Sequence, residues 1–263
     1  AGMIPRSFRL LIFLLLLGSA AFGVAAATLT VDGVEFAYRL PAGPPQAIMV
    51  LFGGRNWKGD DTLKRFRFDE LADRHGLILL SPSFRDRNYW EPEKWSGPAL
   101  KRAVAELERR CRMPSRRLLL YGYSAGGQCA NLFYAWMPEK VAAWGAHACG
   151  VYFTGKVKNP APALVTCGTL DDARWSISRT FISNYRENGG KLLWKYSRNG
   201  HELSPQTLEL ARAWFDALLT GGKNQFVADD DSREVLPISR KHEIDPEYRN
   251  EIPNRNVLDL WLK

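Results

Sequence analysis

The sequence lacks the features that mark several specialised classes of protein. No segment repeats with a period of about 20 to 50 residues, which excludes a solenoid or a repeat array. There is no glycine-rich phosphate loop, and the cysteines and histidines do not have the spacing of metal ligands, so we expect no cofactor and no metal. Hydrophobic residues make up 46% of the 263 residues and charged residues 24%, a balance that indicates a globular chain and excludes a disordered one.

Acidic residues are fewer than basic ones. The 28 Asp and Glu against 36 Lys and Arg leave a formal net charge of +8, which would favour a polyanion if the charge were concentrated on one face. The densest groups of arginine, in residues 109–112 and 116–117, surround the expected end of a helix and a turn. Because no recognition motif accompanies them, we expect no nucleic-acid partner.

Long apolar runs without charge are confined to the N-terminus. Arg6 and Arg9 precede the apolar run 10–17, and small residues follow as far as 24–27. We therefore predict a signal peptide over residues 1–27, a secreted or periplasmic protein, and no stable membrane association after cleavage. An uncleaved membrane anchor is the alternative, because the uncharged stretch 10–27 is about long enough to span a bilayer. Its glycine and serine interruptions and its alanine-rich end favour cleavage.

Cysteine is scarce, and the four residues present allow three disulfide pairings. They are Cys111, Cys129, Cys149 and Cys167. Export would favour oxidation, and Cys149 and Cys167 each follow the end of an expected strand, where neighbouring strands come within disulfide range. This pair is the first candidate for a disulfide.

Expected strands and helices alternate along residues 28–222. After a hairpin over 29–40, the expected strands are 47–52, 77–80, 117–123, 141–148, 163–167 and 191–196. The expected helices are 62–75, 97–112, 125–136, 174–188 and 205–219. This alternation predicts an α/β fold with a mostly parallel sheet and helices on both of its faces. Ligands of such sheets bind at the carboxyl ends of the strands.

Residues 223–263 lack this rhythm. They contain the acidic run 229–231 and are rich in Arg, Glu, Asn and Pro, although residues 257–262 could form a short terminal helix. We treat this segment as a C-terminal extension of unknown role.

A serine lies between a buried strand and a helix. The motif Gly122-x-Ser124-x-Gly126 follows the strand expected at 117–123, and a helix is expected from residue 125. In this context the small residues relieve crowding at a sharp turn, and the hydroxyl projects from the edge of the sheet. The motif resembles the nucleophile elbow of the α/β-hydrolase superfamily.

A serine nucleophile needs a base and a group that orients the base. Asp171 follows the strand 163–167, and His201 follows the strand 191–196, so both lie in loops where the resemblance implies the acid and the base. Ser124 would then attack a carbonyl, His201 would move the proton, and Asp171 would orient His201. Asp172 is the alternative acid.

Other residues complete this expectation. The resemblance implies an oxyanion hole formed by the N–H groups of Ala125 and Gly54, although Phe52 stands where the superfamily often has a histidine. His75 at a helix end and His147 within a strand are better explained as structural residues.

The resemblance covers about residues 28–222 and is nearest to secreted single-domain serine esterases related to polyhydroxyalkanoate depolymerases and to feruloyl or acetylxylan esterases. It implies a carboxylic ester hydrolase with an acyl-enzyme intermediate. The connection 149–162 is too short for a large lid domain, which implies an open site for bulky or polymer-linked esters, with Trp57, Tyr152 and Trp175 as candidate substrate contacts. A serine peptidase on the same fold and a non-catalytic carbohydrate- or partner-binding protein are the alternatives.

Overall fold

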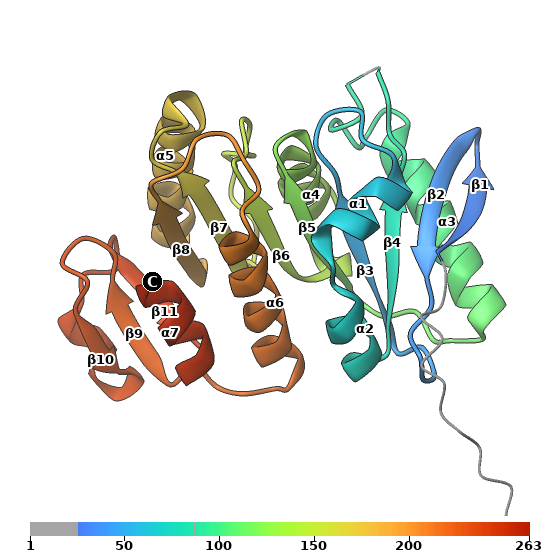
Figure 1. Cartoon of the computed structure of the whole chain (residues 1–263). Helices are drawn as coiled ribbons and strands as arrows, with labels where there is room; N and C mark the ends of the chain where they lie inside the picture. The colour runs from blue at the N-terminus through green and yellow to red at the C-terminus, as the bar shows by residue number, and fades with distance from the viewer. Residues whose placement is uncertain (1–25, 87) are drawn as a thin grey trace, which may run out of the picture.

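An eight-stranded sheet runs through the molecule in the computed structural model, which describes residues 26–86 and 88–263. Its strands are β1 (Ala27–Val31), β2 (Val34–Arg39), β3 (Ala47–Phe52), β4 (Leu77–Pro82), β5 (Leu118–Tyr123), β6 (Val141–His147), β7 (Ala163–Gly168) and β8 (Leu192–Ser197). They follow the spatial order β1-β2-β4-β3-β5-β6-β7-β8 (Figure 1). The first two strands form an antiparallel edge hairpin, and β4, β3, β5, β6, β7 and β8 are parallel to one another.

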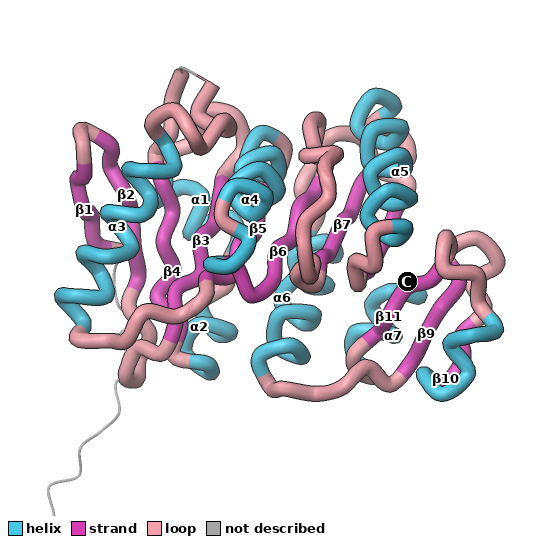
Figure 2. Tube along the Cα trace, turned by 180° about the vertical axis from the view of Figure 1, so that it is seen from behind, coloured by secondary structure: helices cyan, strands magenta, loops and turns pink. Residues whose placement is uncertain are grey.

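Helices cover both faces of the sheet. They are α1 (Gly59–Phe66), α2 (Asp69–His75), α3 (Ser96–Cys111), α4 (Ala125–Trp136), α5 (Asp172–Glu187) and α6 (Pro205–Leu219), and a 3₁₀ turn (Pro138–Lys140) precedes β6. Figure 1 shows α1, α2 and α6 on one face, and Figure 2 shows α3, α4 and α5 on the other. Each layer of helices has its own buried apolar cluster against the sheet. The predicted α/β fold with a mostly parallel sheet is confirmed.

The helix expected over 62–75 is two helices, so this part of the prediction is wrong. Arg67 ends α1 in the left-handed conformation, with φ of 54°, and its N–H donates to the carbonyl of Leu63. In one continuous helix, residues 66 and 68 would point about 200° apart around the axis. The break lets both Phe66 and Phe68 turn inward, where their rings lie 5.6 Å from that of Tyr121.

The candidate Cys149–Cys167 disulfide is not formed, because all four cysteines are free thiols. Ala148 has a left-handed backbone, with φ of 51°, so the chain leaves the direction of β6 just before Cys149. The Cys149 thiol donates to the carbonyl of Val151 at 2.9 Å. Cys149 and Cys167 are therefore small buried side chains of the core.

The C-terminal extension has more structure than its sequence indicated. It contains β9 (Phe226–Asp229), β10 (Val235–Pro237), a 3₁₀ segment (Ile238–Glu243), β11 (Arg249–Ile252) and α7 (Arg255–Leu262). The strands form an antiparallel sheet in the order β10-β9-β11, which lies beside β8 (Figure 1). The terminal helix was expected, whereas strands of three or four residues are too short to show a clear alternation of polar and apolar side chains.

The signal peptide predicted over 1–27 falls outside the described residues except for its last two. Ala27, its last residue, begins β1 and is paired with Tyr38 of β2. Within residues 26–86 and 88–263, none of the helices is both long enough and apolar enough to cross a membrane.

Candidate active site

Ser124 occupies a strained turn between β5 and α4. Its φ of 57° and ψ of −120° lie in a region of backbone conformation that residues other than glycine rarely adopt. Such a conformation costs about 1 to 3 kcal/mol. The flanking glycines make the turn possible. A Cβ built on Gly122 would lie 1.9 Å from the carbonyl oxygen of Gly126, and one built on Gly126 would lie 2.1 Å from that of Phe52. The close packing of this turn holds the Ser124 hydroxyl at the carboxyl end of β5.

Ser124, His201 and Asp171 form one chain of hydrogen bonds. Ser124 Oγ lies 2.8 Å from His201 Nε2, and His201 Nδ1 lies 2.6 Å from Asp171 Oδ2. A carboxylate only accepts hydrogen bonds, so the network assigns the proton to Nδ1 and leaves Nε2 to accept the Ser124 O–H. A general base for the serine requires this orientation. Asp172, the alternative acid, is the exposed first residue of α5.

The loops of the acid and the base are joined by their backbones. The N–H of Thr169 donates to the carbonyl of Ser197, and the N–H of Leu170 donates to that of Asn199. Gly168 permits this approach, because a Cβ there would lie 2.1 Å from the carbonyl oxygen of Asn199. The parallel pairing of β7 and β8 therefore continues into the two loops that carry Asp171 and His201.

The carboxylate of Asp171 is protected from solvent, and the imidazole of His201 is more open. The Asp171 side chain is 4% exposed, whereas that of His201 is 34% exposed. A cation contacts the other carboxylate oxygen, with Arg174 Nη1 3.6 Å from Asp171 Oδ1. Arg174 lies in the first turn of α5, and it offsets part of the charge that Asp171 presents to His201.

Two residues that the sequence analysis did not assign to the site support the histidine loop. The Tyr123 ring stacks between the rings of His147 and His201, at centroid distances of 5.7 and 5.3 Å, and its hydroxyl donates to the His201 carbonyl. His147 is 1% exposed, as expected for a core histidine, and its Nε2 donates to the carbonyl of Glu202 at 2.6 Å. Its Nδ1 then accepts from Thr166 Oγ1. The position of His147 at the end of the strand next to β5 was the sequence signal for this role.

Burial keeps His147 neutral. Its imidazole is enclosed by protein, and desolvation lowers its pKa from 6.5 to about 4. The neutral ring can hold the donor at Nε2 and the acceptor at Nδ1 at the same time. His147 therefore fixes the backbone of the residue after the base across the neutral pH range.

The candidate oxyanion donors lie on either side of the elbow. Ala125 is the first residue of α4, and N–H groups of a first helical turn have no partner within the helix. Gly54 lies in a tight turn in which the Trp57 N–H donates to the Gly54 carbonyl. A Cβ on Gly126 would lie 2.3 Å from the carbonyl oxygen of Gly53, so this turn rests directly on the start of α4.

The three aromatic residues expected at the substrate have different surroundings. Trp57 is partly exposed beside the Gly53–Gly54 turn, with its ring 5.6 Å from that of Tyr123. Tyr152 is only 7% exposed and stacks on Phe181 at 4.1 Å, so it is a core residue in this structure. Trp175, in the first turn of α5, is partly exposed and packs against Trp194 and Tyr196 of β8. Trp57 is therefore the one of the three that the structure keeps beside the catalytic turn.

Solved structures share this fold at low sequence identity. A thermostable esterase aligns with a TM-score of 0.52 and 19% identity, over 66% of this chain and 54% of the other, so the chain spans about half of that protein. A ferulic acid esterase aligns at 0.59 and 14%, over 74% and 96%. A poly(3-hydroxybutyrate) depolymerase from Bordetella parapertussis aligns at 0.55 and 16%, over 74% and 89%. No protein-family model and no curated protein matches the chain. The order of the strands, the elbow at Ser124 and these neighbours together give the chain an α/β-hydrolase fold of the kind found in esterases.

Proposed function

We propose that this protein is a secreted or periplasmic serine carboxylic ester hydrolase that acts through an acyl-enzyme intermediate. The observation that carries the proposal is the hydrogen-bonded chain from Ser124 through His201 to Asp171. A serine hydroxyl is a poor nucleophile by itself, and this chain supplies the base and its orientation. The proposed location rests on the N-terminal sequence 1–27.

The proposed reaction has two halves. Ser124 Oγ attacks the ester carbonyl while His201 Nε2 takes the proton of the Ser124 hydroxyl. The oxyanion that forms accepts hydrogen bonds from the N–H groups of Ala125 and Gly54. His201 then gives this proton to the departing alcohol, which leaves an acyl ester on Ser124. A water molecule, activated by His201 in the same way, releases the acid and restores the serine. Asp171 stabilises the imidazolium in both halves and stays ionised.

The accessibility of the site favours bulky or polymer-linked esters. The imidazole of His201 is about one third exposed, at 34%, although the Asp171 side chain behind it is only 4% exposed. Trp57 is partly exposed beside the proposed oxyanion turn, with the Arg65 guanidinium 4.5 Å from its ring, and the exposed part of the indole is where a sugar or an aryl ring can make contact. The names of two neighbours indicate, for those proteins, action on the polymer poly(3-hydroxybutyrate) in one case and on esters of ferulic acid in the other.

Hydrolysis of p-nitrophenyl acetate and labelling by a fluorophosphonate test the proposal. We expect both in the wild-type protein, with the label on Ser124, and neither in Ser124→Ala or His201→Ala. Ser176→Ala is the matched control, because Ser176 lies exposed on α5 and its hydroxyl donates to the carbonyl of Asp172. Hydrolysis that persists in Ser124→Ala would refute the proposal. Cleavage of aminoacyl amides in preference to esters would favour the peptidase, and glycan binding without any labelling would favour a binding protein.

A further inference from the structure

The C-terminal extension closes the open edge of the main sheet. An edge strand exposes unpaired N–H and C=O groups, and proteins commonly cover such an edge. Here β8 is the last strand, and β11 and α7 lie against it (Figure 1). The two sheets stay separate, so side chains of the extension must satisfy the outward backbone groups of β8.

The backbone of Trp194, in the middle of β8, makes two hydrogen bonds to side chains of the extension. Its N–H donates to Asn250 Oδ1 at 2.6 Å, and its carbonyl accepts from Trp261 Nε1 at 2.6 Å. Asn250 and Trp261 are both 0% exposed. Two side chains of the extension therefore replace a ninth strand at this position.

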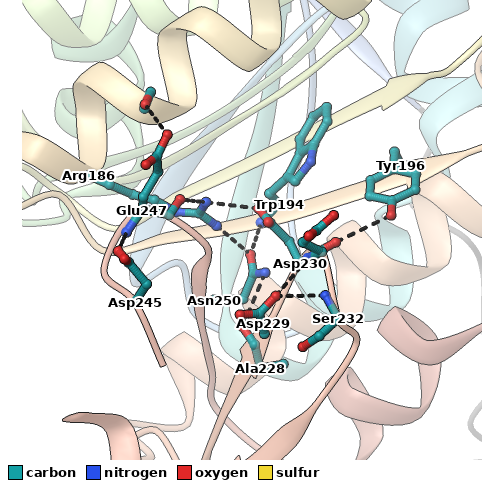
Figure 3. A network of polar contacts seen from close by, with 12 residues as sticks. Arg186, Trp194, Tyr196, Ala228, Asp229, Asp230, Ser232, Asp245, Glu247 and Asn250 are labelled. Atoms are coloured by element: carbon teal, nitrogen blue, oxygen red, sulfur yellow. Dashed lines mark hydrogen bonds and ion pairs between the residues drawn. The ribbon is translucent and has the colours of Figure 1, made fainter. Parts of the chain in front are cut away.

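A buried ion pair holds the same contact to α5. Figure 3 shows Arg186 of α5 between Asp230 and Asn250, with Nη1 2.8 Å from Asp230 Oδ2 and Nη2 3.1 Å from Asn250 Oδ1. Both charged side chains are buried, at 5% and 1% exposure. Removal of one partner would leave a buried charge without compensation, so the network fixes α5 and β8 to the same point of the extension.

The fixed part of β8 contacts the start of α5, which carries the acid. The ring of Trp175, in the first turn of α5, lies 5.5 Å from the ring of Trp194 and 5.4 Å from that of Tyr196. The Trp175 N–H donates to the Asp171 carbonyl at 2.8 Å. The hydroxyl of Tyr196 donates to the carbonyl of Asp230 in the extension (Figure 3). A continuous set of contacts therefore joins the extension to the residue that orients the base.

We propose that Asn250 is a positioning residue for the catalytic triad. It holds β8 at Trp194, and through Trp175 and the histidine loop that follows β8 it sets the distance between Asp171 and His201. The inference rests on the proposed hydrolase function of that triad. Under this proposal, the C-terminal extension contributes to catalysis although it lies far from Ser124 along the chain.

Asn250→Leu tests this role, because leucine has a similar volume and offers no acceptor to Trp194 or Arg186. At a temperature where circular dichroism shows the variant to be folded, we expect kcat for p-nitrophenyl acetate to fall about tenfold and KM to change less than twofold, since misplaced catalytic groups slow the chemical step. The ¹H shift of the proton on His201 Nδ1 should move upfield as its bond to Asp171 lengthens. Asn224→Leu is the matched control, because Asn224 bonds Glu251 within the extension.

A folded Asn250→Leu with an unchanged kcat or an unchanged Nδ1 proton shift would overturn the inference. If this variant does not fold, Trp261→Phe removes the donor to the Trp194 carbonyl and keeps an aromatic ring in the buried position beside Arg233, and the same two changes are expected at about two- to threefold in kcat. Unchanged values in that variant would be equally contrary to the inference. The proton shift needs no turnover. If the wild-type protein hydrolyses no ester, the proposed function fails, and the shift in Asn250→Leu still decides whether Asn250 positions the two residues.

Discussion

Replacement of His147 should remove much of the acid sensitivity of this protein. Burial holds the pKa of His147 at about 4, whereas a histidine in the unfolded chain titrates near 6.5. Above pH 6.5 the ring is neutral in both states and its titration has no effect on folding. As the pH falls below 6.5, His147 binds a proton in the unfolded state and stays neutral in the folded state. The free energy of unfolding therefore decreases until the pH reaches about 4.

The magnitude follows from the size of the shift. A difference of roughly 2.5 pH units corresponds to about 3.4 kcal/mol over the whole range, at about 1.36 kcal/mol per unit. Between pH 7 and pH 5 the loss is about 2 kcal/mol. That is a substantial part of the 5 to 15 kcal/mol that is roughly typical of a folded protein.

Urea unfolding at pH 7 and pH 5 measures this loss in the wild-type protein and in His147→Gln. Glutamine keeps an N–H that can donate to the Glu202 carbonyl and does not titrate, so the variant should lose about 2 kcal/mol less than the wild type between the two pH values. Carboxylates that titrate in both proteins cancel in the comparison. Thr166→Val is the control, because it removes the hydroxyl bonded to Nδ1 and leaves the imidazole in place. Equal losses in the wild type and His147→Gln would refute the reasoning.

Three substitutions test the geometry of the turn at Ser124 and the contact between Asp171 and His201. Ser124→Gly should abolish esterase activity and be about 1 kcal/mol more stable to urea than Ser124→Ala, because glycine adopts the positive φ without strain; equal stabilities would argue against a strained elbow. Asp171→Asn should lower kcat about 10³- to 10⁴-fold in steady-state assays, since the amide favours the wrong tautomer of His201, and a loss under tenfold would contradict the role given to Asp171. Gly126→Ala should lower both Tm and kcat, because its Cβ would lie 2.1 Å from the Phe52 carbonyl oxygen; a variant as stable and active as the wild type would refute that close approach.

The loops of the site were predictable because each functional residue follows a strand whose apolar run is readable. The carboxyl ends of parallel strands lie at one edge of a sheet, so the order of Ser124, Asp171 and His201 after three such strands implied their proximity. The elbow had a second local signal, since only glycine fits at Gly122 and Gly126. The sequence placed His147 at the end of the strand next to β5, but it did not reveal the bond to the Glu202 carbonyl, because a buried histidine that bonds a loop looks like any other core residue along the chain.

The remaining differences between expectation and structure come from contacts between segments far apart in the sequence. Helical spacing continued through Arg67, and only the packing of both Phe66 and Phe68 on Tyr121 accounts for the break. Tyr152 was expected at the substrate as an aromatic residue near a strand end, and its stacking on Phe181 of α5 instead buries it. Both contacts join residues that are far apart in the sequence, so no local pattern of residues predicts them.

The sequence by itself determined the α/β class, the order of most elements and the three loops that carry the candidate triad. These depend on hydrophobic periodicity and turn residues, which act over a few positions of the chain. Tertiary structure alone decided that the cysteines are free thiols, that Tyr123 lies between two histidines, and that Asn250 and Trp261 complete the edge of β8. The physical reason is that hydrogen bonding and packing between distant segments depend on three-dimensional proximity, which local sequence patterns do not encode.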